Sequence, residues 1–442
     1  MASRPAAIVP DFAFDAKWID APAEGPAPEF DATYCQMRIQ VRDKIVTKFR
    51  TDDGQSGETI QVPAYPAAEW MATNWWALFH EPEKGENSDT SFSDAGYRFR
   101  HWLGAARNGF ALPDLWIAPR GDNVQIDAFE TYLKASRVSF TEAAEMHLSP
   151  ADIKERASTF VRHVVSRLNA KKIKDTALQE IWRTIEKTSP DSEQYCKLIG
   201  MLGLSPYDDL GDLDAALDTM TDALPMRIVE DLCEAATPDE LPALSAFVTS
   251  VFSTMRASGQ DVDMRGLPDQ PSYRTGAPWK WGKAVADDLR KAFSASAIEA
   301  ESSATIFAKL GVDPDAIVAL QDNDGTDSID GAIELHDRKA RMAILSRKDR
   351  ASRRFAAGRA LFMAWGATPH DNARLLTHAK TREQQASRAF AAELIAPIEF
   401  LRKTVGRGPV SGNRISNIAS TLEAPEPVVR YQMVNHGIAL AA

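Results

Sequence analysis

Cysteine is scarce in this chain. The three thiols of its 442 residues, Cys35, Cys196 and Cys233, lie far apart and form no CxxC pair. Closely spaced cysteine pairs are the usual mark of zinc ribbons, and many cysteines in a short chain mark a disulfide framework. Neither is supported here, so we predict no metal site and a reducing, cytoplasmic environment.

Long apolar runs are missing as well. No run reaches the ~18 residues that a membrane span needs, and the first fifteen residues lack the apolar core of a secretory signal. Hydrophobic residues make up 44% and charged residues 26%, which is typical of globular proteins and too apolar for a disordered chain. We expect a globular protein without a membrane partner, in two or three domains at roughly 150 residues each.

The common catalytic and cofactor motifs are absent too. The sequence contains no GxGxxG, no phosphate-binding P-loop and no GxSxG nucleophile motif. Its serine, cysteine and histidine residues are too scattered to suggest a catalytic triad. No cofactor is therefore predicted.

Charge is unevenly distributed. The net charge is −11, which disfavours a general nucleic-acid coat, yet residues 337–414 hold 17 basic and 6 acidic side chains. Two interpretations stay open: this basic segment balances acidic parts of the same molecule, or it binds nucleic acid or a phosphorylated ligand. The anion-binding candidates are its densest cations, Arg347, Lys348, Arg350, Arg353 and Arg354.

Local composition divides the chain into five segments. Residues 1–30 are rich in alanine and proline, which predicts an extended arm. An alternation of apolar and polar residues begins at Tyr34 and predicts the strands of an N-terminal α+β domain over 31–148. Helical periodicity predicts a helical domain over 149–256, and the glycines and prolines of 257–278 predict a linker.

The fifth segment, residues 279–442, is predicted to combine a small sheet with helices. The expected fold class is therefore α+β and multidomain, with an N-terminal mixed β domain, a helical middle and a C-terminal domain whose small sheet packs on helices.

The N-terminal domain holds an unusual share of the ten tryptophans. Buried aromatic side chains are the default interpretation. The alternative is a stacking or cation–π pocket for a ligand. The candidates for that pocket are Trp75 and Trp76, with Arg98 and His101 as its polar rim.

Two phrases in the C-terminal domain point to a known family. Arg353-Arg354-Phe355 leads into a predicted helix, and about 35 residues later comes Phe390-Ala391-Ala392-Glu393-Leu394. Short predicted strands precede the first phrase, and a small helical pair over 415–435 ends the domain. This order resembles the ImmA/IrrE family of zinc metallopeptidase-like bacterial proteins, over roughly residues 280–442.

The resemblance implies a metallopeptidase-like fold with an HExxH helix, in which two histidines bind Zn²⁺ and the glutamate deprotonates the metal-bound water. In register with Arg354-Phe355, these three positions hold Arg359, Ala360 and Met363. Arginine has no lone pair to donate, alanine has no base, and a thioether is a poor ligand for zinc. The third ligand position of the family falls near Ala386, with Glu383 close but out of register.

We therefore expect a catalytically inactive metallopeptidase-like protein that regulates or binds a protein partner. The resemblance implies bacterial stress response, mobile-element control or phage defence, because active relatives cleave or relieve repressors. In this interpretation Arg359 replaces the charge of the metal, and the degenerate cleft of Arg359, Ala360, Met363 and Glu383 binds an anionic or peptide group. Two alternatives stay open: an active hydrolase with a non-standard site, and a nucleic-acid-binding regulator. The sequence also leaves open whether the protein forms a homo-oligomer.

Overall fold

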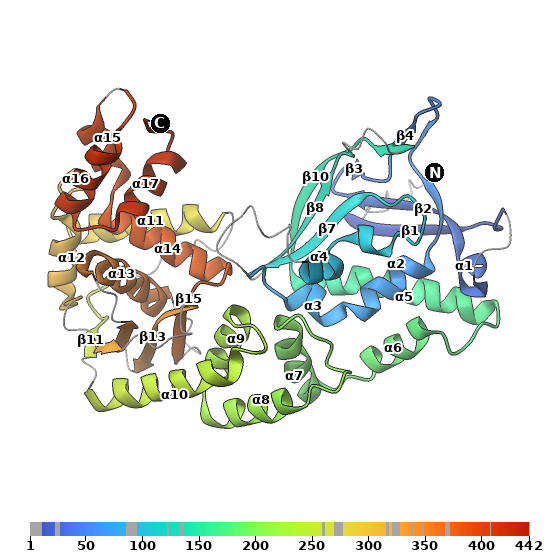
Figure 1. Cartoon of the computed structure of the whole chain (residues 1–442), viewed down its shortest axis with the longest axis horizontal. Helices are drawn as coiled ribbons and strands as arrows, with labels where there is room; N and C mark the ends of the chain where they lie inside the picture. The colour runs from blue at the N-terminus through green and yellow to red at the C-terminus, as the bar shows by residue number, and fades with distance from the viewer. Residues whose placement is uncertain are drawn as a thin grey trace, which may run out of the picture. The chain divides into compact units, whose positions relative to one another are not determined.

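The computed structural model divides the chain into two compact units, residues 1–209 and 210–442 (Figure 1). None of the helices it describes combines the length and apolar character that a bilayer crossing requires. Helices and small sheets are mixed in both units, as the sequence predicted. The structure describes residues 11–22, 27–84, 95–121, 123–131, 137–258, 261–268, 277–314, 318–320, 328–336, 339–345, 349–366, 372–406 and 408–441.

The described part of the N-terminal unit contains small antiparallel sheets. In the first, β2 (Tyr34–Val41) pairs along its length with β1 (Phe12–Trp18), and its other edge carries β3 (Lys44–Ile45) and β6 (Ile60–Pro63). The other sheets have the strand orders β10 (Ala144–Leu148), β8 (Asn123–Phe129), β7 (Asp114–Arg120) and β5 (Ser56–Gly57), β4 (Phe49–Thr51), β9 (Val138–Phe140).

Strand β1 corrects the prediction that residues 1–30 form an extended arm. Phe12 is buried, and Phe14 packs on Phe160 with ring centroids 5.1 Å apart. The prolines of this region lie before and after the strand. The average composition of residues 1–30 therefore did not reveal that seven consecutive residues contain no proline and can form a strand. A short helix, α1 (Pro28–Ala32), follows β1, whereas residues 1–10 of the predicted arm lie outside the described part.

Helices cover the sheets of the N-terminal unit. The long α5 (Pro150–Ala170) packs on β1 and β8, and it is capped by Ser149, whose Oγ accepts from the backbone N–H of Asp152. The remaining helical elements are α2 (Tyr65–Thr73), α3 (Trp75–His80), α4 (Ala95–His101), a 3₁₀ turn (Leu103–Ala106), α6 (Ala177–Glu186) and α7 (Pro190–Met201).

The predicted helical middle, residues 149–256, is divided between the two units. Helix α6 packs on α2, and α7 packs on α3 so closely that a Cβ at Gly200 would lie 2.6 Å from the backbone of Trp76. The next three helices, α8 (Asp212–Ala223), α9 (Met226–Ala235) and α10 (Leu241–Ser258), belong to the C-terminal unit. Periodicity locates the buried face of a helix but does not say which element covers it, so the prediction of a separate domain was wrong.

The C-terminal unit is built on one mixed sheet with the order β11 (Asp261–Asp263), β14 (Lys339–Leu345), β13 (Ile329–His336) and β15 (Ala373–Thr377), while β12 (Val318–Leu320) pairs in parallel with β14. Strand β11 lies inside the predicted linker 257–278. Val262 at its centre is buried, so this part of the segment is core and not linker.

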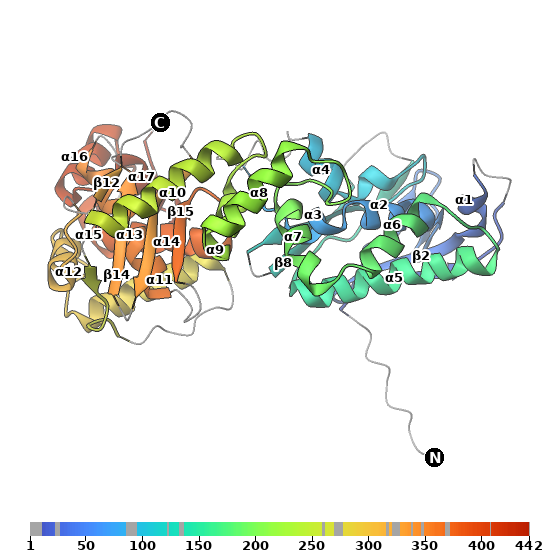
Figure 2. The same ribbon diagram turned by 90° about the horizontal axis from the view of Figure 1, so that it is seen from below.

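The sheet lies between α13 (Arg350–Gly366) and α10 (Figures 1 and 2). Helix α14 (Arg382–Ile395) packs against both α13 and α11 (Pro278–Ala292). The sheet strands β13 and β14 and the helices α13 and α14 supply the combination of a small sheet and helices that the sequence predicted for residues 279–442. The other helices of the unit are α12 (Ser302–Leu310), α15 (Ile398–Val405), α16 (Gly412–Leu422) and α17 (Glu426–Asn435).

The contact between α11 and α14 depends on Gly282. A Cβ at this position would overlap the carbonyl oxygen of Ala386 and lie 2.7 Å from the backbone nitrogen of Phe390. We therefore expect Gly282→Ala to lower the free energy of unfolding by about 1–3 kcal/mol, despite the better helix propensity of alanine. Urea unfolding followed by circular dichroism would measure the change.

Gly412→Ala is the matched control, because a Cβ there would meet nothing within 4 Å. It should leave the free energy of unfolding unchanged or slightly higher. Equal stability of Gly282→Ala and the unsubstituted protein would contradict the close packing of α11 on α14.

Candidate functional site

Helix α13 carries Arg359 into the interior of the C-terminal unit. Its sequence is rich in alanine and arginine, which favour helix. The side chain of Arg359 is 1% exposed, and the neighbouring Ala360 and Met363 are buried with it. A buried guanidinium is costly unless each of its donors meets an acceptor.

Four groups of the same unit supply those acceptors. Nη1 of Arg359 contacts a carboxylate oxygen of Asp330 on β13. Nη2 donates to the carbonyl oxygen of Thr377 at 2.7 Å and to Oε1 of Gln384 at 2.8 Å. Nε donates to Oγ of Ser387 at 3.3 Å. The guanidinium is thus held from β13, β15 and α14 together.

Two further side chains surround this arginine core, which we define as Arg359, Asp330, Thr377, Gln384 and Ser387. His378 Nε2 lies 3.1 Å from Asp330 Oδ2. Arg388 donates to the carbonyl oxygens of Thr377, at 3.3 Å, and Ala379, at 3.0 Å. Burial and the nearby Arg359 lower the pKa of Arg388 to about 10.

The residues at the predicted metal position do not fit a zinc ion. Arg359 offers no lone pair, Ala360 has no donor atom, and Met363 lies in the apolar core. In the parts of the chain that the structure describes, no group of three or more His, Cys, Asp or Glu side chains is arranged to hold a metal. The three cysteines are buried and form no disulfide.

Glu383, predicted to belong to the degenerate cleft, points elsewhere. Its Oε2 lies 2.5 Å from Nη1 of Arg374 and 3.6 Å from Nη2 of Arg227. The residue of α14 that meets Arg359 is its neighbour, Gln384. Sequence register placed the two side by side, but one step along a helix turns the side chain by about 100°, enough to separate Glu383 from the arginine core.

Glu383 instead joins a buried ion cluster between α9 and β15. Nε of Arg374 donates to Asp231 at 3.1 Å, and Arg227 lies 3.4 Å from the same carboxylate. Glu234, one turn further along α9, lies 3.9 Å from Arg227. Burial and the nearby Asp231 raise the pKa of Glu234 to about 7, although Arg227 and Arg374 act in the opposite direction.

Of the predicted anion-binding cluster, one described member, Arg354, is buried, whereas Arg350 is exposed. Arg354 is 5% exposed, donates to Oγ of Ser303 at 2.8 Å and lies 2.5 Å from Oε2 of Glu423. Arg350 lies 3.5 Å from the same carboxylate, and Arg353 is half-buried. Arg347 and Lys348 lie outside the described residues.

Several other cations of the basic segment pair with acids that precede or follow it in the chain. Asp231 pairs with Arg374, Asp261 with Arg341, Asp330 with Arg359, and Glu423 with Arg354. These contacts are the internal balance that one of the two sequence interpretations predicted.

Trp75 and Trp76, predicted to line an N-terminal pocket, lie in the interior of the N-terminal unit. Both are buried in the hydrophobic core, where Trp75 packs edge-on against Trp182 at 5.1 Å. Arg98 stacks on Trp102, with the guanidinium carbon 4.2 Å from the ring centroid. The default interpretation of these tryptophans, a core role, therefore describes them.

His101, the fourth candidate of that pocket, is fully buried. Its Nδ1 lies 2.7 Å from the carbonyl oxygen of Ile117, and its Nε2 lies 3.0 Å from Oε2 of Glu81. Burial alone would raise the pKa of Glu81, but hydrogen bonds from His101 and Arg100 outweigh it and lower the pKa. This polar group fixes α4 to β7 and is closed to solvent.

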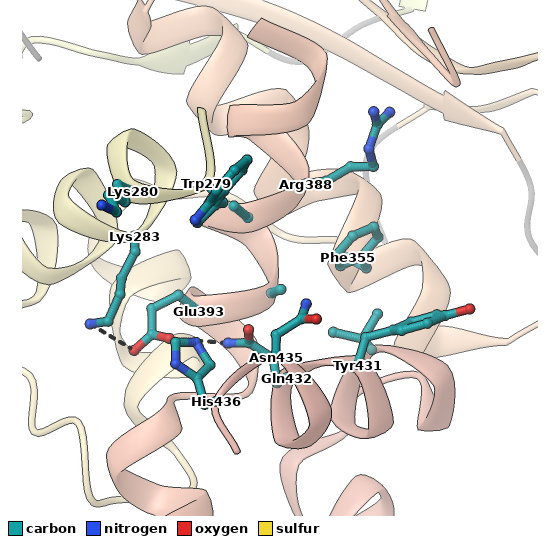
Figure 3. A pocket seen from close by; sticks show the side chains of 13 residues that line it. Trp279, Lys280, Lys283, Phe355, Arg388, Glu393, Tyr431, Gln432, Asn435 and His436 are labelled. Atoms are coloured by element: carbon teal, nitrogen blue, oxygen red, sulfur yellow. Dashed lines mark hydrogen bonds and ion pairs between the residues drawn. The ribbon is translucent and has the colours of Figure 1, made fainter. Parts of the chain in front are cut away.

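A cavity of about 790 Å³ opens beside the arginine core (Figure 3). Its walls carry Trp279, Phe355 and Tyr431, from the start of α11, from α13 and from α17. Phe355 lies one turn before Arg359 on α13, and Arg388 both lines the cavity and donates to Thr377 of the core. We call this cavity the aromatic pocket.

The floor of the aromatic pocket is polar. Glu393 is 2% exposed and accepts a hydrogen bond from Nε2 of Gln432 at 3.0 Å. Its other oxygen lies 3.7 Å from Lys283 and 3.7 Å from Arg290. Burial raises the pKa of Glu393 despite these two cations. In Figure 3, Lys283, Glu393, Gln432 and His436 lie close together at one end of the pocket.

Sequence reasoning missed both Asp330 and the aromatic pocket. Asp330 precedes the strand predicted at 332–335, and nothing in the chain marks an acid that will face an arginine 29 residues later. The pocket joins α11, α13, α14 and α17, whose packing no local pattern specifies. Phe355, Ala392 and Glu393 had a signal, because they belong to the two phrases that carry the family resemblance.

No protein-family model, curated protein or solved structure matches this chain. The function is therefore argued from the arginine core and the aromatic pocket themselves.

Removing Arg359 should strongly destabilise the C-terminal unit. Arg359→Met removes the guanidinium that contacts the buried carboxylate of Asp330, and we expect the free energy of unfolding to fall by about 3–5 kcal/mol. Adding Asp330→Asn should recover part of that loss, because the uncompensated charge is then gone. Urea unfolding of both single variants and the double variant gives the coupling energy.

Arg430→Met is the control for this cycle. Arg430 is exposed, and its Nη2 lies 3.2 Å from Oε1 of Glu426, one turn earlier on the same helix. Its removal should therefore change the free energy of unfolding by about 0.5 kcal/mol or less. Strictly additive effects of Arg359→Met and Asp330→Asn would show that the two side chains do not interact.

The raised pKa of Glu234 predicts a pH-dependent stability. A carboxyl group whose pKa is higher in the folded state contributes stability at low pH that is lost as the pH rises through about 7. Glu234→Gln keeps the neutral form at every pH. It should therefore raise the melting temperature near pH 8 and change it little near pH 5.

Scanning calorimetry at the two pH values measures this effect, with Asp222→Asn on the exposed face of α8 as the control. A melting temperature that Glu234→Gln lowers at pH 8 would contradict the assignment.

Proposed function

We propose that the C-terminal unit is a catalytically inactive, metallopeptidase-like binding module with a regulatory role. The observation that carries this proposal is that the side chain of Arg359 is bound by other residues of the same unit. Its guanidinium fills the position where the resemblance calls for the first zinc ligand, and it is bound by Asp330, Thr377, Gln384 and Ser387. A guanidinium so held supplies a fixed positive charge but neither a ligand nor a base.

The order of elements supports the metallopeptidase-like part of the proposal. A small sheet, the helix α13 with Arg359, the strand β15, the helix α14 with Glu393 and the pair α16–α17 follow one another along the chain. The proposed setting rests on the family resemblance alone: bacterial stress response, mobile-element control or phage defence, with a protein as the regulated partner.

Binding of nucleic acid is the weaker alternative. Phosphate contacts require basic side chains that can reach the ligand, but Arg354 and Arg359 are buried and paired within the unit. An active hydrolase with a non-standard site has no comparable support, since the buried pair His101–Glu81 is closed to substrate.

Zinc analysis tests the proposal. The purified full chain, incubated with zinc and then desalted, should carry no stoichiometric zinc when measured by mass spectrometry, and it should not cleave a protein partner. The positive control is the triple variant Arg359→His, Ala360→Glu, Met363→His. It restores the HExxH spacing beside the carboxylate of Asp330 and should gain zinc.

Stoichiometric zinc in the unsubstituted protein, together with cleavage of a protein partner, would overturn the proposal. Zinc that binds equally well after Arg359→Met would lie elsewhere on the molecule.

A further inference from the structure

The aromatic pocket has the size of a small-molecule site. Its volume of about 790 Å³ lies within the 300–1,000 Å³ that such sites typically occupy. Most of the surface that lines it is apolar, although seven of its 13 lining residues are polar or charged, and four of these gather at one end (Figure 3). That combination is typical of a ligand site whose apolar walls supply affinity and whose polar groups fix orientation.

Two of its aromatic side chains are unusually exposed. Trp279 is 60% exposed and Tyr431 is 66% exposed. Large aromatic rings gain most from burial, so their exposure on the rim of one cavity marks a surface that a ligand can cover. Phe355 is half-buried behind them.

The part of α14 that faces the pocket carries small side chains. Ala389 and Ala392 line it three positions apart, which places both on one face of the helix. Methyl groups there leave room for a flat group between Trp279 and the pair Phe355–Tyr431, which lie on opposite sides of the pocket in Figure 3. The shape therefore favours a planar ring over a branched aliphatic group.

The charge of the pocket favours an anion. Lys280, Lys283 and Arg388 line it, and its one acid is Glu393. Glu393 faces Lys283 and Arg290, and Asp287 pairs with the same two cations. These four charges balance one another, so the charges of Lys280 and Arg388 remain. Trp279 and Lys280 stand in the first turn of the 15-residue helix α11, whose positive dipole end adds to the same sign.

An aromatic cage for a quaternary ammonium group is the competing interpretation, because Trp, Tyr and Phe side chains also bind such cations. The cations that line this pocket would repel an ammonium group, and the single acid is already compensated. We therefore reject the cage on charge.

We propose that the aromatic pocket binds a small molecule with a flat aromatic ring and an anionic carboxylate or phosphate group. The ring stacks between Trp279 and Tyr431, and the anionic group lies beside Lys280 at the start of α11. This assignment does not depend on whether the C-terminal unit cleaves protein, so its test is separate from the zinc analysis.

Calorimetric titration of the full chain tests the assignment. The probes are adenosine monophosphate and indole-3-acetate, which carry a phosphate and a carboxylate, and their neutral counterparts adenosine and indole-3-ethanol. At least one anionic probe should bind, and its neutral counterpart should bind about tenfold more weakly or not at all. The probe that binds identifies the anionic group.

Variants locate the bound probe. Trp279→Ala and Lys280→Glu should each weaken binding about tenfold or more. Their controls are Val434→Ala, an exposed apolar residue on α17 that does not line the pocket, and Lys291→Glu, an exposed lysine at the other end of α11. Both controls should bind as the unsubstituted protein does. Circular dichroism checks that every variant folds, and Tyr431→Ala replaces Trp279→Ala if that variant does not.

Three outcomes would each overturn the assignment: no binding of either anionic probe at millimolar concentration, unchanged binding after Trp279→Ala and Lys280→Glu, or tighter binding of phenyltrimethylammonium than of both anions.

Discussion

The C-terminal unit depends on one electrostatic constraint: the charge of the buried Arg359 guanidinium must be compensated within the protein. Taking an arginine out of water is unfavourable unless the protein replaces the lost hydration with well-placed acceptors. Here the acceptors come from two strands and one helix that are distant in sequence. The sheet, α13 and α14 must all be in place before the arginine is satisfied. The side chain of Arg359 thus links α13 to β13, β15 and α14.

A second constraint is how tightly α14 is enclosed. Helix α11 approaches it at Gly282, and α13 approaches it at Gly358, where a Cβ would lie 3.1 Å from the side chain of Ala391. Such contacts fix the helix against rotation and translation. The face of α14 that remains uncovered bears Ala389 and Ala392, and it becomes one side of the aromatic pocket. Close packing on two sides thereby determines the shape of the cavity on the third.

Local patterns were enough to locate most helices and strands but not their partners. The alternation from Tyr34 matches β2, and α14 lies in the segment where helices were expected. The same reasoning grouped α5 to α10 into one domain, because a helix face does not name the element that covers it. Residues 1–30 were predicted to be an extended arm, because their average content of alanine and proline gave no sign of β1. Contacts between side chains were harder to predict from the sequence than helices and strands. Arg359 was identified as a candidate, but its partner Asp330 and the ion cluster around Arg374 depend on how the strands pack, which sequence spacing does not show.

The carbonyl oxygen of Thr377 has a consequence for how the two halves of the site are linked. It accepts from Arg359 on one side and from Arg388, which lines the aromatic pocket, on the other. A carbonyl oxygen has two lone pairs, and here the oxygen accepts from two different arginines. The buried Arg359 and the pocket-lining Arg388 therefore share one acceptor at the end of β15, so a group that enters the cavity and displaces Arg388 also changes the surroundings of Arg359.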